Sequence, residues 1–293
     1  MRALFTALLT LTAIALSGCA PPAARQEPAV WRISDADSEI WLYGTVHLLP
    51  PDLRWRGPRF EAAFAAADEL VLETDASDQA SAQLAALAQQ LGALPEGERL
   101  SQRLSPAERT ALEQAANDLG LDLSLLDRQR PWLTALQLSY AAAVRAGHRP
   151  EAGVETVLVR EAQARGLRMS FLETPERQVR ILAELSPEDQ LRFLAVTLND
   201  VEGGADLMTA MDRAWARGDA DTLENLLEPQ WRAAGGGVRE ALILRRNRDW
   251  ADQIEARLTG SGRVFIAVGA AHLVGEDSVV DLLRERGIAV EGP

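Results

Sequence analysis

The sequence predicts an α/β fold in which a mixed central sheet is built from the N- and C-terminal thirds and a helical middle region packs over it as a cap. Two runs at opposite ends of the chain predict the sheet. Trp41-Leu-Tyr-Gly-Thr-Val-His47 and Val264-Phe-Ile-Ala-Val-Gly-Ala-Ala-His272 each read as a buried strand that ends in Gly-x-x-His. Capped helical segments between these runs predict the cap.

The first third of the chain is expected to supply three strands. Residues 30–33 and 38–46 are apolar runs on either side of Ser34-Asp-Ala-Asp37, which is typical of a hairpin. A short helix is predicted over residues 59–67. Residues 69–75 then read as a strand that ends in acidic side chains.

Capping residues divide the middle of the chain into helices. Ser105-Pro-Ala-Glu108 combines an N-cap hydroxyl, a proline at the first helical position and a glutamate that completes a capping box. One short strand is expected at residues 168–173. Helices are predicted over residues 80–91, 105–119, 131–146, 153–165, 191–217 and 238–258.

The last third returns to sheet. Residues 263–269 are expected to form a strand, residues 277–286 a helix, and residues 288–290 a last short strand. The first and last thirds are therefore expected to share one sheet.

The N-terminus resembles the signal peptide of bacterial lipoproteins. An apolar run at residues 3–16 follows Met1-Arg2, and Leu16-Ser-Gly-Cys19 resembles a lipobox. We expect a signal peptide at 1–18, a lipidated Cys19 with a tether at 19–29, and one domain at 30–293. This pattern predicts a lipid anchor in the cell envelope, facing the periplasm and, with Ala20 after the cysteine, in the outer membrane.

Composition excludes several functional classes. The net charge is −13, so no basic surface is available for nucleic acid. All thirty Lys and Arg residues are arginine, which removes Schiff-base mechanisms and the phosphate-loop lysine. The one cysteine lies in the lipobox, so the mature domain has no thiol nucleophile.

Four ionisable residues fall just past predicted strand ends, and they are His47, Glu73, Glu173 and His272. Ligands of open α/β sheets bind beyond the carboxyl ends of the strands, so these residues are expected to converge there. The third histidine, His148, is expected to lie in a turn without a chemical role.

Glu155 is a fifth candidate. It lies in the first turn of the helix predicted after Gly153, on the face that carries Leu158, Val159 and Ala162. A carboxylate on the core side needs a cation, a metal ion or a good hydrogen-bond donor. We therefore expect a histidine, an arginine or an ion beside it.

These residues together resemble the TraB/GumN family, which includes bacterial pheromone-shutdown proteins and the Tiki proteases of animals. The resemblance covers nearly all of the chain from Val30 onward. The matching pieces are Trp41-Leu-Tyr-Gly-Thr-Val-His47, Leu70-Val-Leu-Glu73, Gly153-Val-Glu155-Thr, Phe171-Leu-Glu173-Thr with Gln178, Arg246-Asn247 with Trp250, and Val268-Gly-Ala-Ala-His272-Leu.

The resemblance implies a metal-dependent peptidase site at the paired Gly-x-x-His motifs and an acidic residue. It also implies a fold related to the erythromycin esterases and to a haem-binding lipoprotein group, which use that scaffold for metal-free hydrolysis and for ligand binding. The chain has no His-Glu-x-x-His, so the zincin helix does not apply.

The leading hypothesis is a lipid-anchored, periplasm-facing metal-dependent hydrolase, in particular a peptidase, with a peptide or small molecule as the substrate. His47 and His272 are the expected ligands of a divalent ion (Mn, Co, Zn or Fe), with Glu73 or Glu173 completing the set. A bound ion would supply an activated water and polarise the scissile carbonyl.

The remaining candidate residues receive catalytic roles. Glu155 or Glu173 is the expected general base and acid, Arg246 is expected to stabilise an oxyanion, and Asn247 to orient a carboxylate. Two alternatives stay open. One is a metal-free hydrolase with His47 as the base, a glutamate that holds its tautomer and Arg246 as the electrophile. The other is a lipoprotein that binds haem, a metal or a peptide without turnover.

Overall fold

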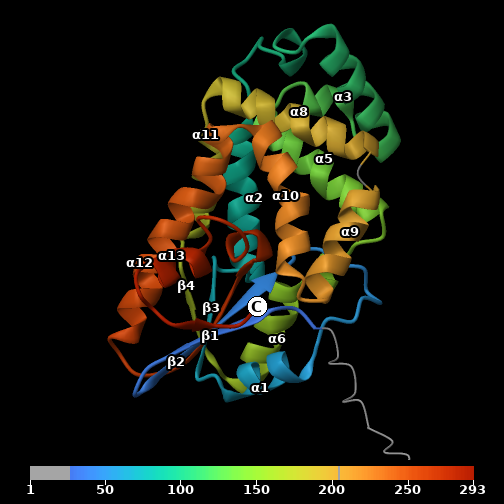
Figure 1. The fold of residues 1–293 in the computed structure, drawn as a ribbon. Coiled ribbons are helices and arrows are strands. Elements are labelled where there is room, and N and C mark those ends of the chain that lie inside the picture. The colour runs from blue at the N-terminus through green and yellow to red at the C-terminus, as the bar shows by residue number, and fades with distance from the viewer. Residues whose placement is uncertain (1–26, 204) are drawn as a thin grey trace, which may run out of the picture.

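The centre of the molecule is a six-stranded mixed sheet, which Figure 1 shows in the lower half of the computed structural model. The structure describes residues 27–203 and 205–293. Across the sheet the strands follow the order β4-β3-β5-β2-β1-β6. They are β1 (Val30–Ser34), β2 (Ser38–Thr45), β3 (Glu69–Leu72), β4 (Arg168–Phe171), β5 (Gly262–Gly269) and β6 (Val290–Glu291).

Four neighbouring strands run in the same direction. β2 pairs in parallel with β5, β5 with β3, and β3 with β4, whereas β1 and β6 add an antiparallel edge. Thr45 lies opposite Gly269, and Leu72 lies opposite both Ala267 and Phe171. The carboxyl ends of the four parallel strands therefore meet at one edge of the sheet.

Helices cover both faces of the sheet, because successive strand residues point to opposite sides. Tyr43 and Phe265 pack against α1 (Pro58–Ala66) and α6 (Val154–Arg165). Leu42 and Ile266 belong to a second core with buried side chains of α12 (Arg245–Leu258) and α13 (Val279–Glu285). These are the three layers of a doubly covered sheet.

The middle of the chain forms a helical cap, which stands above the sheet in Figure 1. A separate apolar core joins α3 (Pro106–Leu119), α5 (Pro131–Arg145) and α8 (Pro187–Gly203) within it. Its α-helices are α2 (Asp78–Gly92), α3 (Pro106–Leu119), α4 (Leu123–Leu126), α5 (Pro131–Arg145), α7 (Pro175–Ala183), α8 (Pro187–Gly203), α9 (Ala205–Ala216), α10 (Ala220–Ala234) and α11 (Gly236–Arg239). Single 3-10 turns are η1 (Leu100–Gln102), η2 (Pro150–Ala152) and η4 (Ala270–His272), and η3 (Glu240–Leu244) is a π-helical turn.

Local capping explains the helix starts that the sequence predicted. Ser105 accepts a hydrogen bond from the amide of Glu108, and the Glu108 side chain accepts one from the Ser105 amide, which completes the predicted capping box. The helix ends at Gly120, which adopts the left-handed conformation with φ 68°.

The predicted α/β class with a mixed sheet and a helical cap is confirmed, with two corrections. The sheet is not built from the first and last thirds of the chain alone. Its edge strand β4 comes from the middle third, and it joins the sheet because it pairs in parallel with β3. The predicted tether also extends too far. Glu27 is 6% exposed and accepts hydrogen bonds from Arg59, so residues 27–29 belong to the folded domain.

The predicted signal peptide and Cys19 lie outside the described residues. Within residues 27–203 and 205–293, no helix has both the length and the apolar character needed to cross a membrane.

Candidate active site

The carboxyl ends of the parallel strands bring together the residues that the sequence predicted there. Glu173 follows β4, Glu73 follows β3, His272 follows β5 and His47 follows β2, in the same order as the strands in the sheet. His47, Glu73 and His272 line one cavity. The predicted convergence of the two Gly-x-x-His motifs is thus seen in the structure.

The guanidinium of Arg246, on α12, lies at the centre of this cluster. Its Nε donates to Oε1 of Glu173 at 2.9 Å, and its Nη2 donates to Glu173 Oε2 at 2.9 Å and to Glu73 Oε2 at 2.6 Å. Its Nη1 contacts Nε2 of His272 at 3.0 Å and donates to the Leu242 carbonyl at 3.2 Å. All five N–H donors of the guanidinium therefore have an acceptor.

Glu73 is buried and ionised. Oε1 accepts from the Gly269 amide at 2.6 Å, and Oε2 accepts from Gln178 at 3.1 Å as well as from Arg246. Burial alone would raise the pKa of this carboxyl. The charges of His272, which is protonated only below its own pKa of about 3, and of Arg246 outweigh burial and lower the pKa of Glu73 to about 2. A Cβ at Gly269 would come within 3.1 Å of Glu73 Oε1, so glycine leaves room for this short contact.

His272 is held as a neutral imidazole. The Asn247 Nδ2 donates to the Asp277 carbonyl at 2.8 Å, so Asn247 Oδ1 is left to accept from His272 Nδ1 at 2.6 Å. This assignment puts the proton on Nδ1 and leaves the Nε2 lone pair to face Arg246. Burial, with the charge of Arg246 acting in the same direction, lowers the pKa of His272 to about 3.

A π-helical turn, η3, directly precedes α12 and its Arg246. Such turns insert one extra residue into a helix and are frequent at functional sites. Here the next turn carries Arg246, Asn247 and Trp250 on its buried side. The Arg246 Cζ lies 4.5 Å from the Trp250 ring centroid, and the rings of Trp250 and His272 are 4.4 Å apart. The indole thus supports the cation on one side.

His47 has a different environment. Its Nδ1 lies 2.7 Å from Oε1 of Glu155, which also accepts from the hydroxyl of Thr45. The His47 side chain is 69% exposed, whereas that of Glu155 is 14% exposed. The Glu155 carboxylate raises the pKa of His47 to about 9. In return, His47 outweighs burial and lowers the pKa of Glu155.

A close backbone approach positions Glu155. The Val154 amide donates to the Val46 carbonyl at 3.1 Å, so the start of α6 is joined to the end of β2. A Cβ at Gly153 would lie 2.0 Å from the carbonyl oxygen of His47. Glycine is required here because the two segments touch, which explains the Gly-Val-Glu sequence.

His148 has a buried partner that the sequence did not predict. It is 4% exposed, its Nε2 lies 2.7 Å from Oδ2 of Asp212 on α9, and both residues line the same cavity as His47. The pairing does not test the expectation that His148 has no chemical role, which stays a prediction. The signal that could have found the pair is Asp212, a lone acid in the otherwise apolar stripe of Met208, Met211 and Trp215.

The predicted metal ligands do not fit a metal ion in this arrangement. A catalytic zinc site needs about three protein ligands with free lone pairs. The His272 Nε2 and Glu73 Oε2 lone pairs face Arg246, and Glu73 Oε1 faces the Gly269 amide. Among the described residues, no group of three or more His, Cys, Asp or Glu side chains is arranged to hold a metal ion.

The other predicted roles are placed but not tested by the geometry. Glu173 has both oxygens on Arg246, so it is not free to act as a base without breaking that pair. Asn247 orients His272 and not a carboxylate. Arg246 lies in the cavity wall, but it would have to exchange one of its contacts to bind an oxyanion.

Two features of the site were missed from the sequence, namely the Thr45 hydroxyl beside Glu155 and the contact of Gly153 with the His47 carbonyl. Neither has a sequence signal of its own.

Fold and site together define an α/β protein with a histidine, glutamate and arginine cluster at the ends of its parallel strands. The family model described as the TraB/PrgY/gumN family matches residues 29–292. The chain belongs to this family, as the sequence motifs indicated.

The relatives span nearly the same length. The chain is 26% identical over 257 residues to the uncharacterized protein YbaP of Escherichia coli (strain K12), covering 88% of this chain and 92% of that protein. It is 27% identical to YbaP of Shigella flexneri, with 83% and 87% covered. An uncharacterized protein of Treponema pallidum (strain Nichols) is 22% identical, with 89% and 81% covered. No solved structure matches the chain.

The Gly153 contact gives a test of how His47 is held. We expect Gly153→Ala to destabilise the protein by roughly 1–3 kcal/mol, because its Cβ collides with the His47 carbonyl. The shift of α6 separates His47 from Glu155, so the pKa of His47 falls from about 9 toward its ordinary value. Thermal unfolding and NMR titration of the imidazole measure the two effects.

Gly203→Ala is the matched control, since nothing lies within 4 Å of a Cβ at that position. It should leave both quantities unchanged. An unaltered His47 titration in Gly153→Ala would show that the contact does not hold the pair together.

Proposed function

We propose that this protein is a hydrolase of ester or amide bonds in which His47, oriented by Glu155, activates water. The observation that carries the proposal is the asymmetry of the His47 ring. Nδ1 is engaged by Glu155, while Nε2 has no hydrogen-bond partner in the part of the chain that the structure describes. A carboxylate on one ring nitrogen and an open second nitrogen are the features of a general base.

In the proposed reaction one proton moves from water to His47 and then from His47 to the leaving group. Neutral His47 Nε2 removes a proton from water as the water oxygen forms a bond to the substrate carbonyl carbon. The resulting imidazolium is stabilised by Glu155 at Nδ1. When the tetrahedral intermediate collapses, the bond to the leaving oxygen or nitrogen breaks, and that atom takes the proton from His47. The products are a carboxylic acid and an alcohol or an amine.

The second histidine has a positioning role in this proposal. His272, Glu73, Glu173 and Arg246 hold one another through buried hydrogen bonds, so they form a rigid wall beside His47. Arg246 is proposed to stabilise the oxyanion by exchanging its longest Nη1 contact, the 3.2 Å bond to the Leu242 carbonyl. Because this carbonyl lies in the π-helical turn, the exchange leaves the regular part of α12 intact.

A metal-dependent hydrolase is the second candidate. The observation that favours it is that His47, Glu73 and His272 line one cavity, as the family resemblance implies. It requires Arg246 to give up its hydrogen bonds to His272 Nε2 and Glu73 Oε2, so that the lone pairs of these atoms can bind the ion. The metal identity, Mn, Co, Zn or Fe, would follow from the ligands that such a movement frees.

We further propose that the protein is lipid-anchored at Cys19 and faces the periplasm, in the outer membrane. The support is the sequence pattern of residues 1–19, with an apolar run that ends in Leu-Ser-Gly-Cys. The substrate would then be a peptide or small molecule of the cell envelope.

The pH dependence of hydrolysis tests the role of His47. With a pKa of about 9, His47 is mostly protonated at neutral pH, so activity should rise with pH and level off only above that value. Glu155→Gln removes the charge that raises the pKa, so its activity should rise at lower pH, near the ordinary histidine pKa, to a reduced plateau. Rate profiles of kcat/KM against pH measure this.

His47→Ala should lower kcat roughly 100-fold or more on the high-pH plateau of the wild type, where His47 is neutral. Gln90→Ala, at an exposed position of the cap helix α2 and outside the cavity wall, serves as a control for general effects of substitution. Profiles of identical midpoint in the wild type and in Glu155→Gln would contradict the proposal.

Elemental analysis separates the two candidate mechanisms. The proposed mechanism predicts less than stoichiometric divalent metal in the purified protein and activity that survives a chelator. One equivalent of metal that disappears together with activity in His47→Ala and His272→Ala would favour the second candidate. Added Mn²⁺, Co²⁺ or Zn²⁺ should leave the melting temperature unchanged if Arg246 keeps its contacts.

The anchor has its own test. Cys19→Ser should move the protein from the detergent phase to the aqueous phase in a phase-partition experiment, because no acyl chains can be attached. Gln26→Ala, in the tether, should partition like the wild type. Mass spectrometry of the mature N-terminus provides the direct measurement, and an unmodified or uncleaved N-terminus in the wild type would refute the anchor.

A further inference from the structure

The cavity beside His47 is bounded on the cap side by apolar side chains. Its volume is about 490 Å³, within the range of small-molecule sites. His47, Arg246 and His272 lie on the sheet side. Ala143 of α5 lines the cap wall, and the larger apolar side chains of this wall come from α9, α10 and η3. They are Met208, Met211, Trp215, Leu223, Leu227, Trp231, Leu242 and Ile243.

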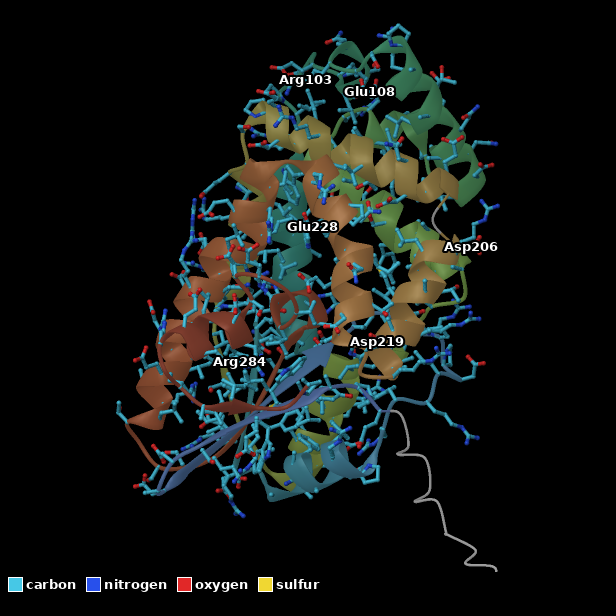
Figure 2. The ribbon with its side chains drawn as sticks, in the orientation of Figure 1. Arg103, Glu108, Asp206, Asp219, Glu228 and Arg284 are labelled. Carbon is cyan, nitrogen blue, oxygen red and sulfur yellow. The ribbon has the colours of Figure 1, made fainter. Side chains whose placement is uncertain are left out.

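Most of this wall is formed by the regular apolar faces of α9 and α10. Met208, Met211 and Trp215 recur at helical spacing on α9, and Leu223, Leu227 and Trp231 recur on α10. Apart from Asp212, no described charged residue of these two helices lines the cavity. Asp206 on α9 and Asp219 before α10 are exposed, Glu228 on α10 is half-buried, and none of the three lines the cavity; Figure 2 labels all three.

Several of these apolar side chains are only half-buried. Met208, Met211, Leu227, Trp231 and Leu242 keep part of their surface uncovered around the cavity. Exposed apolar surface that is gathered in one place favours an apolar ligand. Methionine side chains are flexible, so a wall with two of them adapts to chains of different shape.

The polar side chains that the cap adds to the cavity are His148 and Asp212. They pair with each other at 2.7 Å and are both more than nine-tenths buried. The pair therefore supplies no free cation for an anionic group on the substrate. The charged and polar part of the substrate is left to the sheet side, where His47 and Arg246 lie.

We propose that the cavity binds a bulky apolar group next to the scissile bond, so that the substrate class is esters or amides that carry an alkyl or aryl chain. This inference rests on the proposed hydrolase function for its place in the reaction, but not for the binding itself. The chain belongs either to the acyl side or to the leaving alcohol or amine. Both share the same chemistry, and the experiment below distinguishes them.

The test measures kcat/KM for two ester series. One series runs from p-nitrophenyl acetate to octanoate, and the other runs from methyl acetate to octyl acetate. On the side that occupies the cavity, each added methylene should raise kcat/KM about fourfold until the cavity is full. The series on the other side should stay flat. Titration calorimetry with decanol measures apolar binding without any turnover.

Leu227→Gln should flatten the steep series and weaken decanol binding at least tenfold, because it places an amide in the apolar wall. Met208→Gln provides a second variant if Leu227→Gln unfolds. Leu125→Gln is the matched control, since Leu125 is 58% exposed on α4 and lies outside the cavity wall. It should behave like the wild type.

The outcomes separate the two proposals. Hydrolysis that is independent of chain length in both series, without decanol binding, overturns the apolar site and leaves the hydrolase function standing. Decanol binding that Leu227→Gln abolishes, without hydrolysis of any ester, supports the apolar site and overturns the hydrolase function. Absence of both overturns both.

Discussion

The structure depends on one buried cation, the guanidinium of Arg246. Two carboxylates, Glu73 and Glu173, lie within hydrogen-bond distance of it, and both are less than 10% exposed. Burying either carboxylate without a partner would cost several kcal/mol, and removing one partner of such a pair leaves the others uncompensated. Because these residues come from the ends of β3 and β4 and from α12, the cation joins elements that are far apart in the chain.

The same cation gives the two Gly-x-x-His motifs different chemistry. His272 has both ring nitrogens engaged, by Asn247 and Arg246, and is neutral with a pKa of about 3. His47 has a carboxylate on one nitrogen, and its pKa is about 9. Two copies of one local pattern thus become a fixed wall and an accessible acid–base group. The difference arises from neighbours that α6 and α12 supply.

The cap completes the site by adding an apolar wall opposite these polar groups. α9 and α10 pack close to the sheet edge, where the Trp215 indole donates to the Gly44 carbonyl at 2.8 Å. The His148 and Asp212 pair connects α9 to the loop before η2. These contacts hold the apolar side chains of the cap near His47, so the polarity of the cavity changes from one wall to the other.

The sequence by itself determined the strands and their ends, the capped helices and the strand-end positions of His47, Glu73, Glu173 and His272. Those features are local, because strand and helix periodicity and capping act over a few residues. Only the tertiary structure decided which hydrogen-bond partners the imidazoles and carboxylates of the site have. The contacts of Arg246 with Glu73, the approach of Gly153 to the His47 carbonyl and the His148–Asp212 pair each join residues that no local pattern relates. Hydrogen-bond partners are chosen by distance in space, and periodicity along the chain carries no record of them.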